Sequence, residues 1–139
     1  MAVFNRFNCF SKDVTEAKHN FAAHVYKVML TNTAPVSTNA VKADITELNE
    51  GGGYVAGGGV TTITKGSNSG VERIFASDVT FLSTSGYAGP FRYAVVYNAT
   101  TSGNPLVGWY DYGSSVPALL AGESFIVDFD GVNGFFTLG

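Results

Sequence analysis

Hydrophobic and polar residues alternate along most of the chain from residue 23 onward. In residues 91–97 and 124–129, apolar side chains recur at every second position, the spacing of a half-buried β-strand. Clusters of glycine, proline and asparagine separate such runs, as turns do. Strands are expected over residues 23–31, 41–48, 60–65, 71–82, 91–97, 106–112, 124–129 and 135–138. This pattern predicts an all-β fold, either an antiparallel β-sandwich, including the jelly-roll type, or a barrel.

Two of these strands carry the clearest expectations about which face is buried. Phe91, Tyr93, Val95 and Tyr97 should all face one way, and so should the aromatic and aliphatic residues at 125, 127 and 129. The glycine-rich stretch 51–59 contains a formal G-x-G-x-x-A pattern. A dinucleotide site needs a helix directly after such a pattern, whereas residues 60–64 favour a strand. We therefore expect a tightly turning loop at 51–59.

The first 22 residues follow a different pattern. Phe4, Phe7 and Phe10 are spaced three apart, and Ser11 is a suitable N-cap for a helix of two to three turns. With 139 residues, the chain has the length of one domain. We divide it into an N-terminal arm with a short helix, residues 1–22, and a β-sandwich, residues 23–139.

Composition and charge exclude several classes of protein. Charged residues make up 14% of the chain and hydrophobic residues 45%, which argues against disorder. The net charge of −3 argues against a nucleic-acid-binding protein. A single cysteine, Cys9, cannot form an internal disulfide, and no apolar run reaches the length of a membrane span. Neither nucleic acid nor membrane is an expected partner.

The charge is unevenly distributed. Residues 1–43 carry five bases and two acids, a net charge of +3, while residues 93–139 carry four acids and neither lysine nor arginine. A basic, phenylalanine-rich front predicts an arm that leaves the body and docks on a neighbour. The docking residues would be Phe4, Arg6, Phe7, Phe10, Lys12 and Lys18. The alternative is that this segment folds back as a helix over one end of its own sandwich.

Candidate chemistry is sparse. His19, His24 and Cys9 are too few for a structural zinc site. The run from Asp128 to Gly134 resembles a calcium loop but has Gly139 where the bidentate glutamate belongs, so a turn is the better interpretation. We expect no metal, no cofactor and no catalytic residue.

Two further groups of residues allow other interpretations. The aromatic cluster Trp109-Tyr110-Asp111-Tyr112, with Tyr93 and Tyr97, either lines a sugar site or packs in the core and at a subunit interface. We favour the core and interface interpretation. A small hydrolase would instead need a cleft with perturbed carboxylates, for which the candidates are Asp111, Asp128 and Asp130.

Several segments of the sandwich resemble the head cement, or decoration, proteins of tailed bacteriophages. They are His24–Val36, Lys42–Leu48, Phe91–Asn98, Pro105–Gly113 and Gly122–Asp130. The resemblance covers residues 23–139 and implies a jelly-roll protein without catalysis or cofactor. It implies a virion protein on the outer surface of the capsid that cements neighbouring major capsid protein subunits.

Self-association is also expected, because structural subunits commonly form closed symmetric oligomers. A dimer would suit two-fold positions of a shell, and we favour it over a trimer. The alternative function is a host-recognition or carbohydrate-binding module of a phage tail fibre or baseplate. That alternative predicts exposed Trp109 and Tyr112 side chains.

Overall fold

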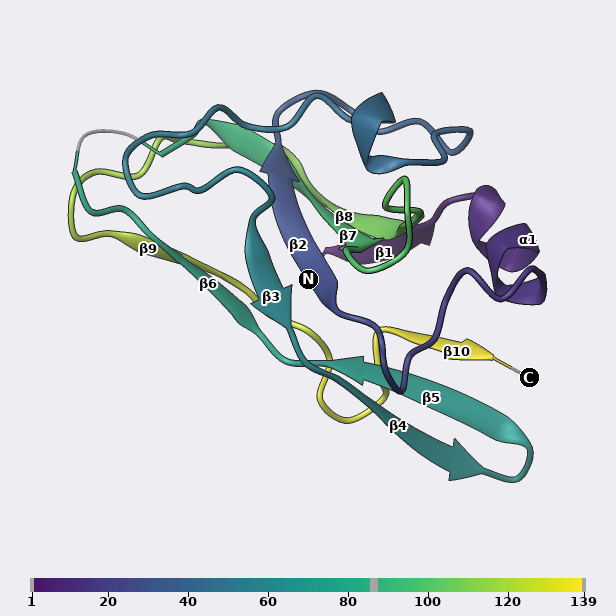
Figure 1. Ribbon diagram of the computed structural model, residues 1–139. Helices are drawn as coiled ribbons and strands as arrows, with labels where there is room; N and C mark the ends of the chain where they lie inside the picture. The colour runs from purple at the N-terminus through teal and green to yellow at the C-terminus, as the bar shows by residue number, and fades with distance from the viewer. Residues whose placement is uncertain (1, 86–87, 139) are drawn as a thin grey trace.

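The computed structural model describes residues 2–85 and 88–138, which form an almost entirely β structure (Figure 1). One short α-helix, α1, spans Cys9–Thr15, and one 3-10 turn, η1, spans Lys42–Asp44. The strands of the described ranges are β1 (Val3–Arg6), β2 (Tyr26–Thr31), β3 (Gly59–Thr61), β4 (Ile63–Asn68), β5 (Val71–Ala76), β6 (Val79–Leu82), β7 (Phe91–Asn98), β8 (Leu106–Val116), β9 (Ser124–Val127) and β10 (Phe136–Leu138).

The strands form two layers. One layer is a five-stranded sheet in the order β1-β8-β7-β2-β3, and the other consists of a three-stranded sheet, β10-β5-β4, and the pair β6-β9. Every strand pairing is antiparallel. The predicted all-β antiparallel sandwich is confirmed, and the jelly-roll topology stays a prediction.

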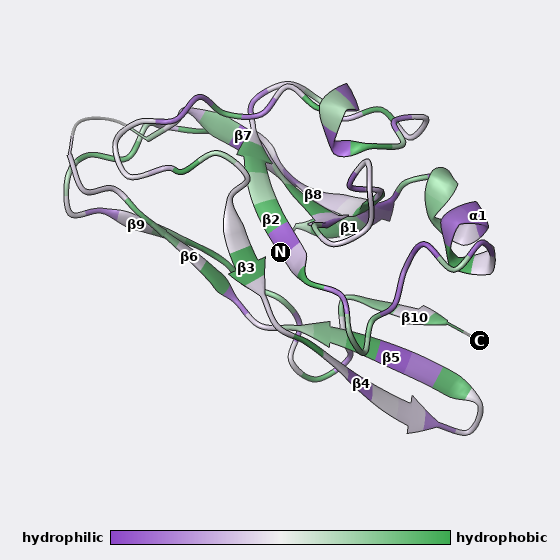
Figure 2. Ribbon diagram, viewed as in Figure 1, coloured by the Kyte–Doolittle hydropathy of each residue, from purple (hydrophilic) through white to green (hydrophobic). Residues whose placement is uncertain are grey.

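The main core lies between the layers. Each strand sends alternate side chains inward, so that Val28 and Leu30 of β2 meet Val127 of β9 and Ile74 of β5 in one buried cluster. The expectation for residues 124–129 is confirmed, since Val127 and Phe129 are buried in this cluster and Phe125 packs against it. Figure 2 shows the hydrophobic colouring concentrated on β2 and β7, the central strands of the large sheet.

The outer face of the five-stranded sheet is covered as well. Met29, Val95 and Tyr97 on that face form a second buried cluster with Phe7, which precedes α1, and Ile45, which follows η1. Antiparallel sheets often leave one face to solvent, but here the long connection from β2 to β3 and the N-terminal segment cover it. Both faces of β2 and β7 are therefore buried.

Residues 91–97 do not share one face as predicted, because the hydrogen-bonding ladder between β7 and β8 is interrupted. The pairing of β7 with β8 shifts register between Phe91 and Tyr93. Because an irregularity of this kind changes which side a residue faces, Phe91 joins the core between the layers, whereas Val95 and Tyr97 join the outer cluster.

The N-terminal segment does not leave the body, contrary to the expectation for Phe4, Phe7 and Phe10. Phe7 and Phe10 are fully buried, and Phe4 packs against the main core. β1 pairs with β8 along Val3–Arg6 and so supplies that edge of the large sheet. The physical reason is twofold: the rings are removed from water, and the backbone of β8 gains a hydrogen-bonding partner.

The short helix begins earlier than expected. α1 has Asn8 as its N-cap and ends at Thr15, so that Ser11 lies inside the helix rather than at its start. At its C-terminal end the backbone of Ala17 adopts a positive φ of 59°, which breaks the helical path before Phe21. The segment therefore folds back over its own sandwich, as the alternative interpretation proposed.

Candidate functional site

The predicted aromatic cluster of Trp109 and Tyr112 is divided between the two faces of β8. Trp109 packs on Phe7 on the outer face, with 4.5 Å between ring centroids. Tyr112 faces the other way and meets Phe125 edge-on at 5.1 Å. Tyr97 belongs to the outer cluster with Trp109. These aromatic residues therefore form no common surface, and both Trp109 and Tyr112 are only half exposed.

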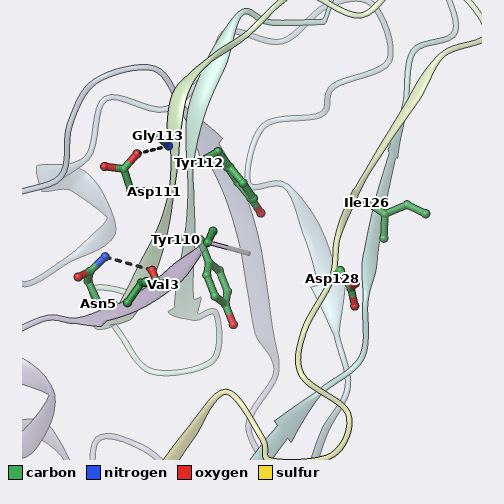
Figure 3. A pocket seen from close by; sticks show the side chains of 9 residues that line it. Val3, Asn5, Tyr110, Asp111, Tyr112, Gly113, Ile126 and Asp128 are labelled. Carbon is green, nitrogen blue, oxygen red and sulfur yellow. Dashed lines mark hydrogen bonds between the residues drawn. The ribbon is translucent and has the colours of Figure 1, made fainter.

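A groove opens instead on the side of β8 that carries Tyr110 and Tyr112. It has a volume of about 720 Å³ and lies between the edge of the large sheet, β1 and β8, and the end of β9. Figure 3 shows both tyrosines pointing from β8 toward the segment with Ile126 and Asp128. The lining residues are Ala2, Val3, Asn5, Tyr110, Asp111, Tyr112, Gly113, Ile126 and Asp128.

The two tyrosines are held as neutral hydroxyls. Burial raises the pKa of Tyr112 to about 12, and the carboxylate of Asp128 adds to this rise. Burial also raises the pKa of Tyr110, with further contributions from Tyr112, Asp130 and Asp128. At any physiological pH both phenols therefore retain their protons and can donate and accept hydrogen bonds.

Asp111 belongs to the groove by position but is already engaged elsewhere. Its carboxylate accepts two bonds from the Arg92 guanidinium, at 2.8 Å from Nε and 3.2 Å from Nη2, and one from the backbone N–H of Gly113. Hydrogen bonding to Arg92 is the main reason that the pKa of Asp111 is lowered. Figure 3 shows its side chain directed away from the two tyrosines.

The third carboxylate considered for a hydrolase is part of a turn. Asp130 accepts bonds from the backbone N–H groups of Val132 and Asn133, both at 2.8 Å, and these bonds lower its pKa. A general acid needs a raised pKa, so the environments of Asp111 and Asp130 do not suit either carboxyl group to that role. The interpretation of residues 128–134 as a strand end and turn is confirmed.

His19 and His24 both approach the side chain of Asn98, but they do not form a three-ligand metal site with Cys9 in the described ranges. His19 Nδ1 lies 3.1 Å from the Tyr26 hydroxyl, and His24 Nδ1 lies 2.9 Å from Asn98 Nδ2. The Cys9 thiol instead approaches the backbone carbonyl of Ala40 at 3.6 Å. Over residues 2–85 and 88–138, no group of three or more histidine, cysteine, aspartate or glutamate side chains is placed to hold a metal ion.

The glycine-rich loop at 51–59 has a structural role in the fold. Glu47 accepts hydrogen bonds from the Tyr54 hydroxyl at 2.7 Å and from the Gly57 N–H at 2.6 Å, and it pairs with Lys42 at 3.0 Å. The hydroxyl of Tyr97 donates to the Gly57 carbonyl. The loop leads into β3 rather than into a helix, which confirms the expectation of a tight turn.

The basic residues of the N-terminal segment lie at its surface, but two of them are balanced locally. Lys12 forms an ion pair with Glu16, and Lys18 pairs with Asp13 at 3.3 Å and with Glu16 at 3.5 Å. Arg6 is exposed and lies over the Phe10 ring, 5.5 Å from its centroid. The predicted basic surface is thus reduced to Arg6 and a largely neutral helix.

The sequence places Tyr110 and Tyr112 in one aromatic cluster with Trp109, offers Asp128 only as a separate candidate carboxylate, and gives Val3 no role. No local motif joins these residues, because the groove depends on β1 completing the sheet beside β8. In the part of the chain that the structure describes, no helix is long and apolar enough to cross a membrane. Comparisons with protein-family models, with curated proteins and with solved structures found no match.

Proposed function

We propose that this protein is a structural virion component that binds the outside of a tailed-phage head and cements neighbouring major capsid protein subunits, stabilising the shell. The resemblance of residues 23–139 to head decoration proteins suggests the role. The observation that supports it best is that both edges of the five-stranded sheet expose aliphatic side chains. Val3 of the edge strand β1 is 71% exposed, and Val60 of the edge strand β3 is 60% exposed.

Such edges suit a clamp. At the β3 edge a neighbouring chain can add to the sheet through main-chain hydrogen bonds, while at the β1 edge the exposed Val3 offers apolar contact. The sheet between these edges is stiffened by packing on both faces, so a pull at one edge is transmitted to the other. Low charge also favours burial against a partner, because the cores of interfaces are depleted in charged residues.

We propose that the contact with the capsid uses side chains that are exposed in the folded chain. Phe4, Phe7 and Phe10 stabilise the body and are not available for docking. Arg6, adjacent to the β1 edge, remains as an exposed cation for an acidic capsid surface. A closed homodimer would carry two copies of each sheet edge. Sedimentation equilibrium should then give about twice the chain mass of 14.6 kDa.

The test is co-sedimentation of the purified chain with phage heads that lack it. Saturable binding is expected, and Val60→Lys should weaken it at least about tenfold because a buried lysine would face apolar partner atoms. The matched control is Val132→Lys in the turn before β10, where the side chain is 81% exposed and belongs to no strand.

Two outcomes would contradict the proposal, and a third would reject the sheet edge as the contact. One is no binding to heads by the folded wild-type chain. The other is equal weakening by Val60→Lys and Val132→Lys, which would leave the sheet edge without a specific role. Binding that both variants retain would likewise reject the edge as the contact.

A further inference from the structure

The groove beside Tyr110 and Tyr112 contains hydrogen-bonding groups that the fold does not use. Throughout residues 2–85 and 88–138, no hydrogen bond joins the Tyr110 hydroxyl, the Tyr112 hydroxyl or the Asp128 carboxylate to another group. By contrast, the hydroxyls of Tyr26, Tyr54 and Tyr97 all have partners. Unused polar groups that converge on a concavity of about 720 Å³ are typical of a small-molecule site.

The charge of the groove restricts its ligand. Asp128 supplies a negative charge, and none of the lining residues is a lysine, arginine or histidine. The nearby guanidinium of Arg92 is held by Asp111. A phosphate, a sulfate or an acidic sugar would therefore meet repulsion without a compensating cation. A neutral molecule rich in hydroxyls would find a charged acceptor in Asp128 and two phenols that both donate and accept.

The groove is also partly apolar. Val3, at its rim, exposes its aliphatic side chain, and the rings of Tyr110 and Tyr112 are fixed by edge-on contacts with Phe129 and Phe125, at 5.5 Å and 5.1 Å. A sugar ring combines hydroxyl groups at its rim with apolar C–H faces, and this arrangement matches fixed phenols beside aliphatic surface. The tyrosines are already ordered, so binding would cost little side-chain entropy.

A peptide strand added along β1 is the main competitor for the same space. Strand addition needs free backbone acceptors, but the Val3 carbonyl already accepts a bond from the Asn5 side chain at 3.2 Å. Strand addition would also leave the Asp128 carboxylate without a defined partner, unless the peptide were basic. These features favour the sugar.

We propose that the groove formed by β1, β8 and residues 126–128 binds a neutral saccharide, with the Asp128 carboxylate and the hydroxyls of Tyr110 and Tyr112 contacting sugar hydroxyls. This site shares Tyr110 and Tyr112 with the aromatic cluster expected from sequence but excludes Trp109, which lies on the opposite face of the sheet. The proposal does not depend on attachment to phage heads, and a variant that loses sugar binding should still co-sediment with heads.

The test is a titration of the ¹⁵N-labelled full chain, followed by NMR. The probes are neutral trisaccharides of glucose, galactose, mannose and N-acetylglucosamine, with trigalacturonic acid as the anionic probe. At least one neutral probe should give saturable shifts in β1, β8 and residues 126–128 by about 20 mM, and the anionic probe should bind at least about tenfold more weakly.

Variants assign the binding to the named groups. Tyr112→Phe and Asp128→Asn each remove one hydrogen-bonding function with little change of shape, and each should weaken binding about fivefold or more. Asp128→Asn should also reduce the discrimination against the anionic probe. Tyr93→Phe and Glu16→Gln, at two positions that do not line the groove, are the matched controls and should bind as the wild type does.

Three results would overturn the proposal. They are the absence of saturable shifts with every neutral probe, shifts that map outside the groove, and Tyr112→Phe and Asp128→Asn variants that keep wild-type affinity. A trilysine peptide tests the competing explanation, that the groove binds a basic peptide. If it binds the groove more tightly than every neutral sugar does, the groove is a site for basic peptides instead. Thermal melts of each variant verify that the fold is retained.

Discussion

His19 is a buried titratable residue with an incomplete set of hydrogen bonds. Its Nδ1 contacts the Tyr26 hydroxyl, but its Nε2 is buried and has no partner within the described ranges. Burial lowers its pKa from 6.5 to about 4, an effect that Asp13 partly opposes and that His24 and Lys18 reinforce. A proton on this ring therefore favours the unfolded chain.

The stability of the protein should consequently fall in mild acid. In the unfolded chain His19 binds a proton near pH 6.5, and in the folded chain only near pH 4. The contribution of the neutral His19 ring to the free energy of unfolding is therefore fully present above pH 6.5 and is lost as the pH falls toward 4. Allowing for the solvent that reaches a partly buried ring, the loss between pH 7 and pH 5 should be about 1 kcal/mol.

Urea denaturation at both pH values would measure this loss. The His19→Gln variant should show a smaller difference between pH 7 and pH 5 than the wild type, whatever its stability at pH 7. An unchanged difference would contradict the assignment to His19.

Gly58 is required by a close backbone approach. A Cβ at this position would lie 1.9 Å from the Val28 carbonyl oxygen, and its φ is +77°. Gly70 has a similar φ of +81°, but a Cβ there would meet nothing within 4 Å. Gly70→Ala should therefore cost about 1 kcal/mol of unfolding free energy, the ordinary penalty of a left-handed backbone, and Gly58→Ala at least about 3 kcal/mol. Equal losses in denaturant titrations of the two variants would contradict the steric explanation.

Among the elements, α1 and β1 show most clearly what the sequence could and could not predict. The phenylalanine spacing of the first ten residues correctly indicated that these rings must pack somewhere. It did not indicate where, because the edge of β8 that accepts β1 lies about a hundred residues away in sequence. Helical spacing and strand pairing were both compatible with Phe4 and Phe7, and tertiary pairing decided between them.

For the segment 41–48, the predicted type of secondary structure was itself wrong. Its apolar residues predicted a strand, but Asp44 accepts hydrogen bonds from the backbone N–H groups of Ala40 and Val41, which closes a 3-10 turn. By contrast, residues 124–129 were predicted correctly, since one face of β9 is buried and the other is open. The groove was not predictable, because Tyr110 and Asp128 are joined by no local pattern.

The packing of α1 makes a direct prediction. Phe10 is fully buried and touches Phe136 of β10, with 5.2 Å between ring centroids. Phe10→Ala should lower the free energy of unfolding by about 3–5 kcal/mol. Val3→Ala, in the same segment but exposed, should change it by less than about 0.5 kcal/mol. Thermal or urea unfolding would measure both, and a neutral Phe10→Ala would instead indicate an arm detached from the body.

At the scale of the whole molecule, apolar packing contributes more to the free energy of unfolding than ion pairs do. The described residues form five ion pairs, and most of the side chains in them are more than a third exposed to solvent. Exposed pairs contribute little and are screened by salt. Raising NaCl from about 20 mM to about 0.5 M at pH 7.5 should therefore change the free energy of unfolding by less than about 1 kcal/mol. A larger loss in urea titrations would show that these ion pairs matter more than their exposure suggests.

The pairing of β1 with β8 also sets an order of events during synthesis. Residues 3–6 leave the ribosome long before their partner strand, which spans Leu106–Val116. Until that strand has emerged, the rings of Phe4 and Phe7 lack their native contacts with Tyr110 and Trp109, and the nascent chain exposes apolar surface there. Completion of the sheet is thus a late step, and β1 finds its place only after β8, although β1 is made long before it.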